Sequence, residues 1–299
     1  MIVTALLAAL GVLSVAFSGV LLATARKRGE LVPTLESIGL GAVTNFLDTL
    51  GIGSFAPTTA WIKLRGLVPD SFIPATLNAG HALPTVAQAC IFIKLVDVDP
   101  GLLLACIAAA VAGAIAGAPV VVRLPVRVVQ GVVGIALLIA AGLYALSNLG
   151  LTPAGGSALA LPAVRFAIAV GAHFVLGALM TFGIGLYAPS LILLSLLGLN
   201  PIAAFPIMMG ACAFLMPVCG IPFVCATRID LRVVIGLALG GIPLVLVAAF
   251  VVRSLSLETL RWGVVVVVLY AAVLLLRSAI RAPAALAQSP GAALRIERG

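Results

Sequence analysis

A pattern of glycine and proline occurs twice in this chain, at a fixed separation of 132 residues. Residues 49–57 read Thr-Leu-Gly-Ile-Gly-Ser-Phe-Ala-Pro, and residues 181–189 read Thr-Phe-Gly-Ile-Gly-Leu-Tyr-Ala-Pro. The same register continues to Pro69 and Pro201. Because glycine and proline interrupt helices, their recurrence in one register indicates two copies of one structural unit.

The composition identifies the class of protein. Of 299 residues, 63% are hydrophobic and only 9% are charged, whereas soluble domains carry about 25% charged residues. The formal net charge of +8 raises the question of a nucleic-acid partner, but no basic stripe with interleaved aromatic residues is present. The basic residues stand instead at the ends of long apolar runs. The chain is therefore predicted to be a polytopic membrane protein that contacts the lipid bilayer and no nucleic acid.

The apolar runs predict the membrane segments. Residues 1–24 precede the basic cluster 26–28, whereas a signal peptide carries its positive charges before the apolar core. We expect a retained first helix, with the N-terminus outside and the basic cluster in the cytoplasm. The tail is predicted to be cytoplasmic and disordered. Further apolar segments lie at 36–62, 71–93, 102–122, 128–147, 163–197, 205–226, 233–252 and 261–279.

Two of these segments, 36–62 and 163–197, are too long for one crossing of about 20 residues. Each is interrupted near its middle by Gly-x-Gly and Ala-Pro. Each is either one crossing with an attached loop or a hairpin that enters the membrane part-way and returns. The positive-inside rule favours hairpins, because they leave 13 Lys and Arg residues in the cytoplasm and 4 outside, against 11 and 6 for single crossings.

Hairpins make the two units inverted relative to each other. Each unit then holds one hairpin and three full crossings, an odd number, so the first hairpin enters from the cytoplasm and the second from outside. The predicted fold is an all-α membrane protein with two inverted repeats and an extra N-terminal helix, an architecture typical of secondary transporters. Its predicted parts are 1–30 for the first helix and basic loop, 35–148 for repeat 1, 163–280 for repeat 2 and 281–299 for the tail.

The two hairpin tips are predicted to form a substrate site. Irregular backbone at membrane depth is tolerated only where it is buried in protein or lines a polar cavity. Glycines permit positive φ there, a proline suits the first turn of the returning helix, and the free amides of that turn favour an anion. The alternative for the glycines is close packing of helices. The candidate binding residues are Thr49, Gly51, Gly53, Ser54, Pro57 and Thr58 in the first copy, Thr181, Gly183, Gly185 and Pro189 in the second, and Asn45 and Asn78 nearby.

Three ionisable residues in the apolar segments are candidates for proton coupling. Asp48 is the one acidic residue well inside such a segment, and an intramembrane carboxylate is a functional candidate by default. Its counterpart in the second unit is Met180, so its role would be asymmetric. His81 and His173 are the only histidines, and either could shuttle a proton. A structural hydrogen bond is the alternative for all three. Gln88, like Asn78, could line the path, with hydrogen bonding between helices as the alternative.

No pattern in the sequence predicts an enzyme. There is no Walker motif, no plausible Ser/His/Asp set and no cluster of metal ligands, so we expect no catalytic residue, no cofactor and no metal site. The cysteines lie inside apolar segments without CxxC or Cys/His spacing, and we expect them to pack between helices. They are Cys90, Cys106, Cys212, Cys219 and Cys225.

The paired Gly-rich segments that end in Ala-Pro resemble the sulfite exporter TauE/SafE family of permeases (TSUP). The loop 227–232, Thr-Arg-Ile-Asp-Leu-Arg, is also similar to that family, and the resemblance covers roughly residues 35–280. It implies a bacterial inner-membrane carrier of small sulfur-containing or organic anions, such as sulfite or sulfonates, without an ATP-hydrolysing part.

By position, the family's Gly-rich motif falls on two sets of residues in this chain. The chain departs from the family at Ser54 and Leu186, positions that are often glycine, and it adds Asn45 and Asp48 in the first copy only. The matching positions are Gly51, Gly53 and Pro57, and again Gly183, Gly185 and Pro189.

The sequence therefore predicts a secondary transporter that moves a small anion by alternating access, coupled to protons or to the anion's own gradient. One alternative is a carrier of a different small organic anion. The other is a non-transporting membrane scaffold or assembly protein whose glycines only pack helices. The expected location is the bacterial inner membrane, multi-pass, with the N-terminus outside and the C-terminus cytoplasmic. The oligomeric state is left open, a homo-oligomer included.

Overall fold

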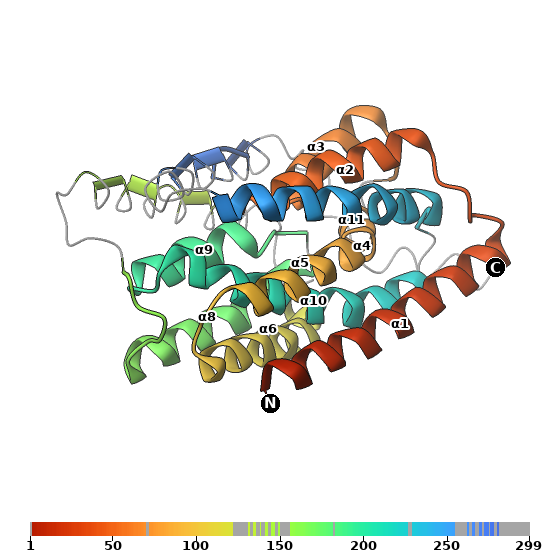
Figure 1. Cartoon of the computed structure of the whole chain (residues 1–299). Helices are drawn as coiled ribbons and strands as arrows, with labels where there is room; N and C mark the ends of the chain where they lie inside the picture. The colour runs from red at the N-terminus through yellow and green to blue at the C-terminus, as the bar shows by residue number, and fades with distance from the viewer. Residues whose placement is uncertain are drawn as a thin grey trace.

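Ten helices make up the described part of the chain (Figure 1). The computed structural model describes residues 2–69, 72–121, 156–181, 183–226 and 229–254, with single positions within 131–149 and 262–280. The predicted segments 128–147 and 261–279 lie largely outside the described residues, and the tail 281–299 lies wholly outside them. The helices are α1 (Ile2–Arg28), α2 (Leu35–Thr49), α3 (Phe55–Arg65), α4 (Ile73–Gly80), α5 (Ala82–Leu95), α6 (Pro100–Val121), α8 (Ala163–Met180), α9 (Tyr187–Leu196), α10 (Pro201–Ala226) and α11 (Leu231–Ser254).

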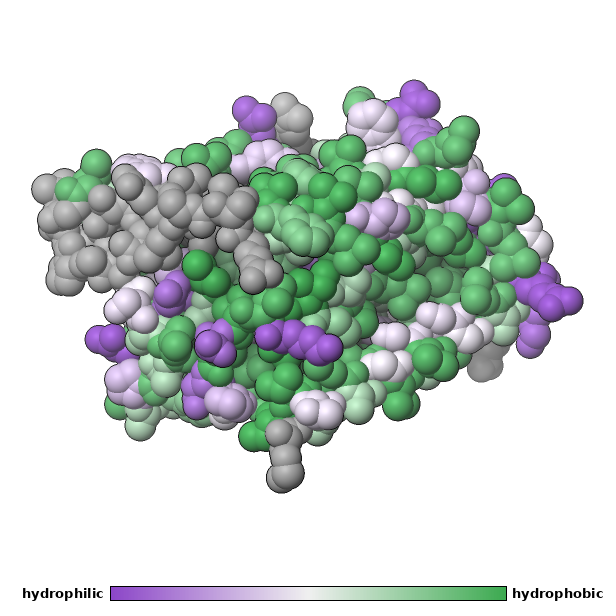
Figure 2. Space-filling model, in the orientation of Figure 1, coloured by the Kyte–Doolittle hydropathy of each residue, from purple (hydrophilic) through white to green (hydrophobic). Residues whose placement is uncertain are grey.

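The distribution of polar residues is that of a membrane-embedded protein. Among the described residues, four helices (α1, α8, α10 and α11) are long and apolar enough to cross a membrane. Large apolar side chains such as Val15 and Phe250 are 75% and 76% exposed, whereas Asn45, Asp48 and His81 are buried. Hydrophobic residues cover most of the visible face in Figure 2. A polar interior beneath an apolar surface suits a bilayer and not water.

Each of the two motif-bearing segments folds back on itself. Glu36 at the start of α2 accepts a hydrogen bond from Arg65 Nε at the end of α3, at 2.8 Å. In the second unit, Arg165 Nη1 at the start of α8 donates to the carbonyl of Leu197, just after α9, at 3.0 Å. The chain therefore reverses at both breaks, and the two hairpins lie on opposite sides of the structure in Figure 1. The hydrogen bond from Arg65 also lowers the pKa of the exposed Glu36 carboxyl.

Polar residues set where two of the long helices begin. Asp99 Oδ1 accepts a hydrogen bond from the backbone N–H of Leu102 at 2.7 Å, at the start of α6. Asn200 Oδ1 accepts one from the N–H of Ile202 at 2.9 Å, at the start of α10. In both helices the cap is followed by a proline at the first helical position, where the missing N–H costs little.

Glycines let two pairs of helices approach backbone to backbone. α2 packs along α11, and α6 packs along α8. A Cβ atom on Gly41 would lie 2.3 Å from the carbonyl oxygen of Leu237, and one on Gly177 would lie 2.0 Å from that of Ala110. Small residues at such contacts are typical of helix packing in membranes. In each pair, a hairpin helix of one predicted unit packs on a helix of the other, so the two units interlock.

One predicted segment is divided in the structure. The sequence predicts a single segment over 71–93, but the helix is interrupted at His81, between α4 and α5. Pro84 supplies the reason, because it has no N–H to donate to the carbonyl of Gly80. Its counterpart in the second unit, α10, continues from Pro201 to Ala226 without a division. The interruption leaves the His81 ring inside the protein.

Candidate functional site

The two hairpin breaks place three glycines in the left-handed region. Gly51, Gly53 and Gly183 have φ of 89°, 86° and 82°, a conformation that other residues rarely adopt. These three therefore use the positive φ that the sequence permits, whereas Gly185 is not in this region. A Cβ atom at Gly185 would make an ordinary contact with the opposite hairpin, so only a larger side chain would fill the space between the tips.

The tips contact each other reciprocally. A Cβ atom on Gly53 would lie 4.0 Å from Cβ of Tyr187, the first residue of α9. A Cβ atom on Gly185 would lie 3.7 Å from Cβ of Phe55, the first residue of α3. Phe55 and Tyr187 occupy the same position in the repeated motif. Each tip glycine thus faces the aromatic residue that begins the other returning helix.

A small cavity lies between the tips. Its volume is about 10 Å³, roughly that needed by one water molecule, so this conformation has no room for a larger anion. Its wall contains one carboxylate and, among the described residues, no Lys or Arg. The first unit contributes Asp48, Gly53, Ser54, Phe55 and Thr85, and the second contributes Met180, Gly185, Leu186, Tyr187 and Met216.

Asp48 is buried in the wall and is held by N–H donors. Its Oδ1 accepts a short hydrogen bond from the backbone N–H of Ser54, and its Oδ2 accepts one from Gln88 Nε2 at 3.0 Å. Gln88 Nε2 also donates to Thr49 Oγ1 at 2.9 Å. N–H donors at both oxygens suit an ionised carboxylate. The bond from Ser54 places that charge at the start of α3, where the helix dipole stabilises it.

Gln88 connects this carboxylate to the second unit. Tyr187 Oη donates a short hydrogen bond to Gln88 Oε1, across 99 residues of sequence. Gln88 is therefore a central member of the site, through hydrogen bonds that join helices. Tyr187 is not among the residues predicted from the sequence, although its place in the repeated motif, matching Phe55, is a signal for it.

His81 joins three helices beside the first tip. Its Nδ1 lies 3.0 Å from Asn45 Oδ1, and its Nε2 lies 3.0 Å from Thr58 Oγ1. Asn45 Nδ2 donates to the carbonyl of Gly41 at 2.7 Å, which orients Oδ1 toward the ring. The ring therefore donates through Nδ1 and accepts the Thr58 hydroxyl at Nε2, as a neutral imidazole does.

His173 has a matching role in the second unit. Its Nδ1 lies 2.8 Å from the carbonyl oxygen of Ala169, and its Nε2 lies 2.9 Å from Ser190 Oγ. Ser190 is the counterpart of Thr58 under the 132-residue shift. Both returning helices thus present a hydroxyl to a histidine, but the two histidines come from different elements. Neither ring lines the cavity.

The other predicted residues support the tips without lining the cavity. Thr49 and Thr181 donate to carbonyls of their own helices, at 2.8 Å and 2.7 Å, so neither hydroxyl proton is available to a ligand here. Asn78 Nδ2 donates to the carbonyl of the last residue of α8 at 3.3 Å, which ties α4 to the second tip. Pro57 and Pro189 stand in the first turns of α3 and α9, as predicted.

Comparison with protein-family models, curated proteins and solved structures found no match. The site is therefore interpreted from its own geometry.

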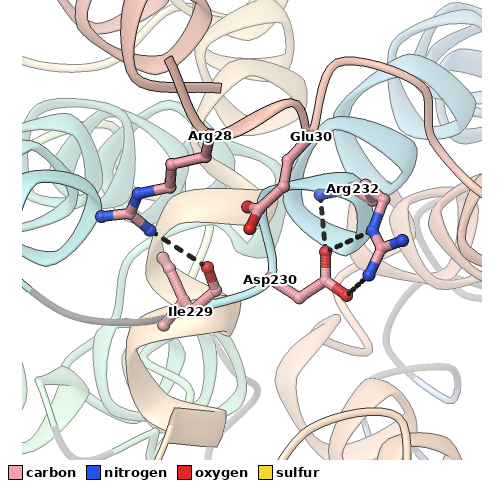
Figure 3. A pocket seen from close by; sticks show the side chains of 5 residues that line it. All are labelled: Arg28, Glu30, Ile229, Asp230 and Arg232. Atoms are coloured by element: carbon pink, nitrogen blue, oxygen red, sulfur yellow. Dashed lines mark hydrogen bonds and ion pairs between the residues drawn. The ribbon is translucent and has the colours of Figure 1, made fainter. Parts of the chain in front are cut away.

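A second, wider hollow lies where α1 and the α10–α11 connection meet (Figure 3). Its volume is about 520 Å³. Arg28 Nη1 donates to the carbonyl of Ile229 at 3.4 Å, and Glu30 accepts from the first backbone N–H of α11 at 2.9 Å. Asp230 and Arg232 form an ion pair at 3.1 Å. Because each of these groups already has a partner in the protein, we interpret the hollow as a contact that joins the end of α1 to the start of α11.

Proposed function

We propose that the protein is a secondary transporter that moves a small anion between its two hairpin tips. The observation that carries this proposal is the reciprocal contact of the tips around a small cavity, inside a membrane-embedded bundle. Broken helices that meet in this way form the substrate sites of many secondary transporters. A cavity of about 10 Å³ fits a closed conformation, which the tips would open by moving apart.

The packing of the hairpins supports inverted units and alternating access. Tips that meet from opposite sides of the structure are expected of hairpins that enter from opposite membrane faces. In this proposal, α2–α3 enters from the cytoplasm and α8–α9 from outside. Each hairpin is also attached to a helix of the other unit, through α2 with α11 and α8 with α6. Because each hairpin packs on a helix of the other unit, a movement between the two units would displace both tips at the same time.

The start of α9 is the part of the site that suits an anion. The first amides of a helix lack partners within the helix and carry the positive end of its dipole. At the start of α3, the Asp48 carboxylate already accepts the Ser54 N–H. In the second unit Met180 stands in place of this carboxylate. Among the described residues, no carboxylate at this position therefore competes with a ligand for the first amides of α9, where Leu186 and Tyr187 line the cavity.

The proposed substrate class is a small sulfur-containing anion such as sulfite or an organosulfonate. It rests on the resemblance to the TauE/SafE family, which also suggests the bacterial inner membrane. Oxyanions accept several backbone hydrogen bonds at once, which fits a wall whose described residues include no basic side chain. A different small organic anion is the main alternative. A scaffold protein is a poorer fit, because it has no need of a buried carboxylate where its two halves meet.

Asp48 is the proposed proton-coupling residue. An anion entering the cavity would be repelled by an ionised carboxylate in the wall, and protonation of Asp48 removes that repulsion. His81 and His173 fit a structural role better, because both ring nitrogens of each are hydrogen-bonded. Proton uptake at Asp48 would therefore accompany anion binding.

The proposal is tested by uptake into proteoliposomes of the purified protein. Labelled sulfite, sulfate, methanesulfonate and acetate are supplied separately, with protein-free liposomes as the control. We expect saturable uptake of sulfite or methanesulfonate, and stronger uptake when the anion side is acidic. Selective uptake of acetate would support the alternative substrate class, and uptake of none of the four would contradict the transport function.

A further inference from the structure

The chain Tyr187–Gln88–Asp48 crosses the site from one unit to the other. Tyr187 Oη donates to Gln88 Oε1, and Gln88 Nε2 donates to Asp48 Oδ2. Both ends of this chain line the cavity, and all three side chains are buried. In this arrangement the hydroxyl proton of Tyr187 is donated to Gln88. It is not available to a ligand in the cavity.

The orientation of the Gln88 amide depends on the charge of Asp48. An ionised carboxylate accepts hydrogen bonds only, so the amide must turn its NH₂ toward Asp48. A protonated Asp48 has an O–H to donate, so the amide can turn over and accept it at Oε1. The NH₂ group then faces Tyr187 Oη, which becomes the acceptor. Thr49, whose hydroxyl now accepts from Gln88 at 2.9 Å, can donate to Oε1 in the turned arrangement.

We propose that Tyr187 is a substrate-binding residue whose hydroxyl is released into the cavity when Asp48 is protonated, by reversal of the Gln88 amide. The proposal rests on the transport function above and deepens it by naming the donor that proton uptake provides. One proton binds to Asp48 and no covalent bond is broken. The Tyr187 O–H, no longer donating to Gln88, turns to the anion at the start of α9. Proton uptake thus both removes a negative charge from the wall and adds a hydrogen-bond donor to it.

Few other titratable groups surround this chain of side chains in the described part of the protein. Cys212 on α10 lies against Met180, with 3.5 Å between the sulfur atoms, and His81 at the start of α5 contacts Asn45, on the helix that carries Asp48. α11, which packs along α2, has no ionisable side chain between Arg232 and Arg253. On α3 and on α5 beyond Gln88, the charged residues stand in the last turn, and Cys90 is the one other titratable group. Asp48 is therefore the acidic group that a proton reaches in this cavity.

The test is infrared difference spectroscopy of the purified protein in lipid nanodiscs, with ring-labelled tyrosine, between neutral and acidic pH. We expect a carboxyl band that appears on acidification, and a tyrosine C–O band that shifts with the same midpoint. Tyr187→Phe should lose the tyrosine shift and keep the carboxyl band, and so should Gln88→Leu. Tyr270→Phe, the same change at a partly exposed site, is the matched control and should keep both bands.

Asp48→Asn provides a second test that does not depend on removing Gln88. An asparagine donates through Nδ2, so it should hold the Gln88 amide in the turned orientation at every pH. We expect its tyrosine band to stand at the acidic position already at neutral pH. A tyrosine shift that survives in Gln88→Leu, or a carboxyl band without any tyrosine shift, would overturn the proposal. Since the spectra require no substrate, a failure here with intact uptake would leave the transport function standing.

Discussion

The close contact between α2 and α11 predicts that Gly41→Ala lowers the unfolding free energy of the protein. A Cβ atom on Gly41 would lie 2.3 Å from the carbonyl oxygen of Leu237 and 2.6 Å from its Cα. Both atoms belong to the backbone, so no side-chain rotation can relieve the clash. In Gly41→Ala the helices would have to separate by about 1 Å to reach ordinary van der Waals contact. Overpacking of this kind costs about 1–3 kcal/mol of unfolding free energy.

Gly39, two residues earlier on the same helix, is the matched control. It is exposed, and no atom lies within 4 Å of a Cβ placed on it. Alanine is a better helix former than glycine by up to about 1 kcal/mol, so Gly39→Ala should be neutral or stabilising. The two variants carry the same chemical change in one helix. Because the gain in helix propensity is common to both variants, their unfolding free energies should differ by about 1–3 kcal/mol, the cost of overpacking at Gly41.

The assay is equilibrium unfolding of each variant by SDS in mixed micelles, followed by tryptophan fluorescence. The second hairpin repeats the comparison, because a Cβ on Gly177 would lie 2.0 Å from the Ala110 carbonyl, whereas Gly171 has open space. We expect Gly177→Ala to be destabilised and Gly171→Ala to be neutral. If Gly41→Ala and Gly177→Ala were as stable as their controls, the interlocked packing of the two units would be refuted.

Two further predictions concern the hairpins. In a cysteine-free background, we expect Leu196→Cys to react with a membrane-impermeant maleimide from outside the cell. Its counterpart in the first unit, Leu64→Cys, should react only in inside-out vesicles. Labelling of both variants from one side would exclude inverted units. The hydrogen bond from Arg65 lowers the pKa of Glu36. This hydrogen bond therefore stabilises the folded protein fully at pH values above the ordinary carboxyl pKa, and the stabilisation is lost as the pH falls through the lowered pKa. Wild type should therefore melt slightly higher than Glu36→Gln at neutral pH and no higher in acid, and an advantage that persists in acid would contradict this reading.

The repeated motif made much of the architecture predictable. The glycines and prolines at the same offsets predicted both breaks, and Pro57 and Pro189 stand in the first helical turns as expected. Charge counting favoured hairpins, and the Glu36–Arg65 contact shows that the first segment folds back. These features depend on short motifs, on a repeat and on the positions of charges, so they can be identified in a single sequence. The segments 128–147 and 261–279 lie largely outside the described residues, so their crossings remain predictions.

The connections within the site could not be predicted in the same way. The sequence marks Asp48 because a carboxylate in an apolar segment is costly, but its partners lie elsewhere in the chain. Gln88 is 40 residues away, and Tyr187 is 99 residues beyond Gln88. No periodicity relates these positions, because they meet only when the two units pack. The interruption at His81 is not predicted for a different reason, since a single proline at position 84 does not end a segment that is long and hydrophobic enough to cross a membrane.

The most direct test of the central claim is anion exchange by a variant that alters only the contact of the tips. Gly185 has ordinary φ and faces Cβ of Phe55, so Gly185→Leu should fill that contact without straining the backbone. Gly39→Leu, in open space, is the control. With the anion identified by the uptake panel, we expect counterflow to be abolished in Gly185→Leu and unchanged in Gly39→Leu, with both proteins folded. Wild-type exchange by a folded Gly185→Leu would show that the anion does not pass between the tips.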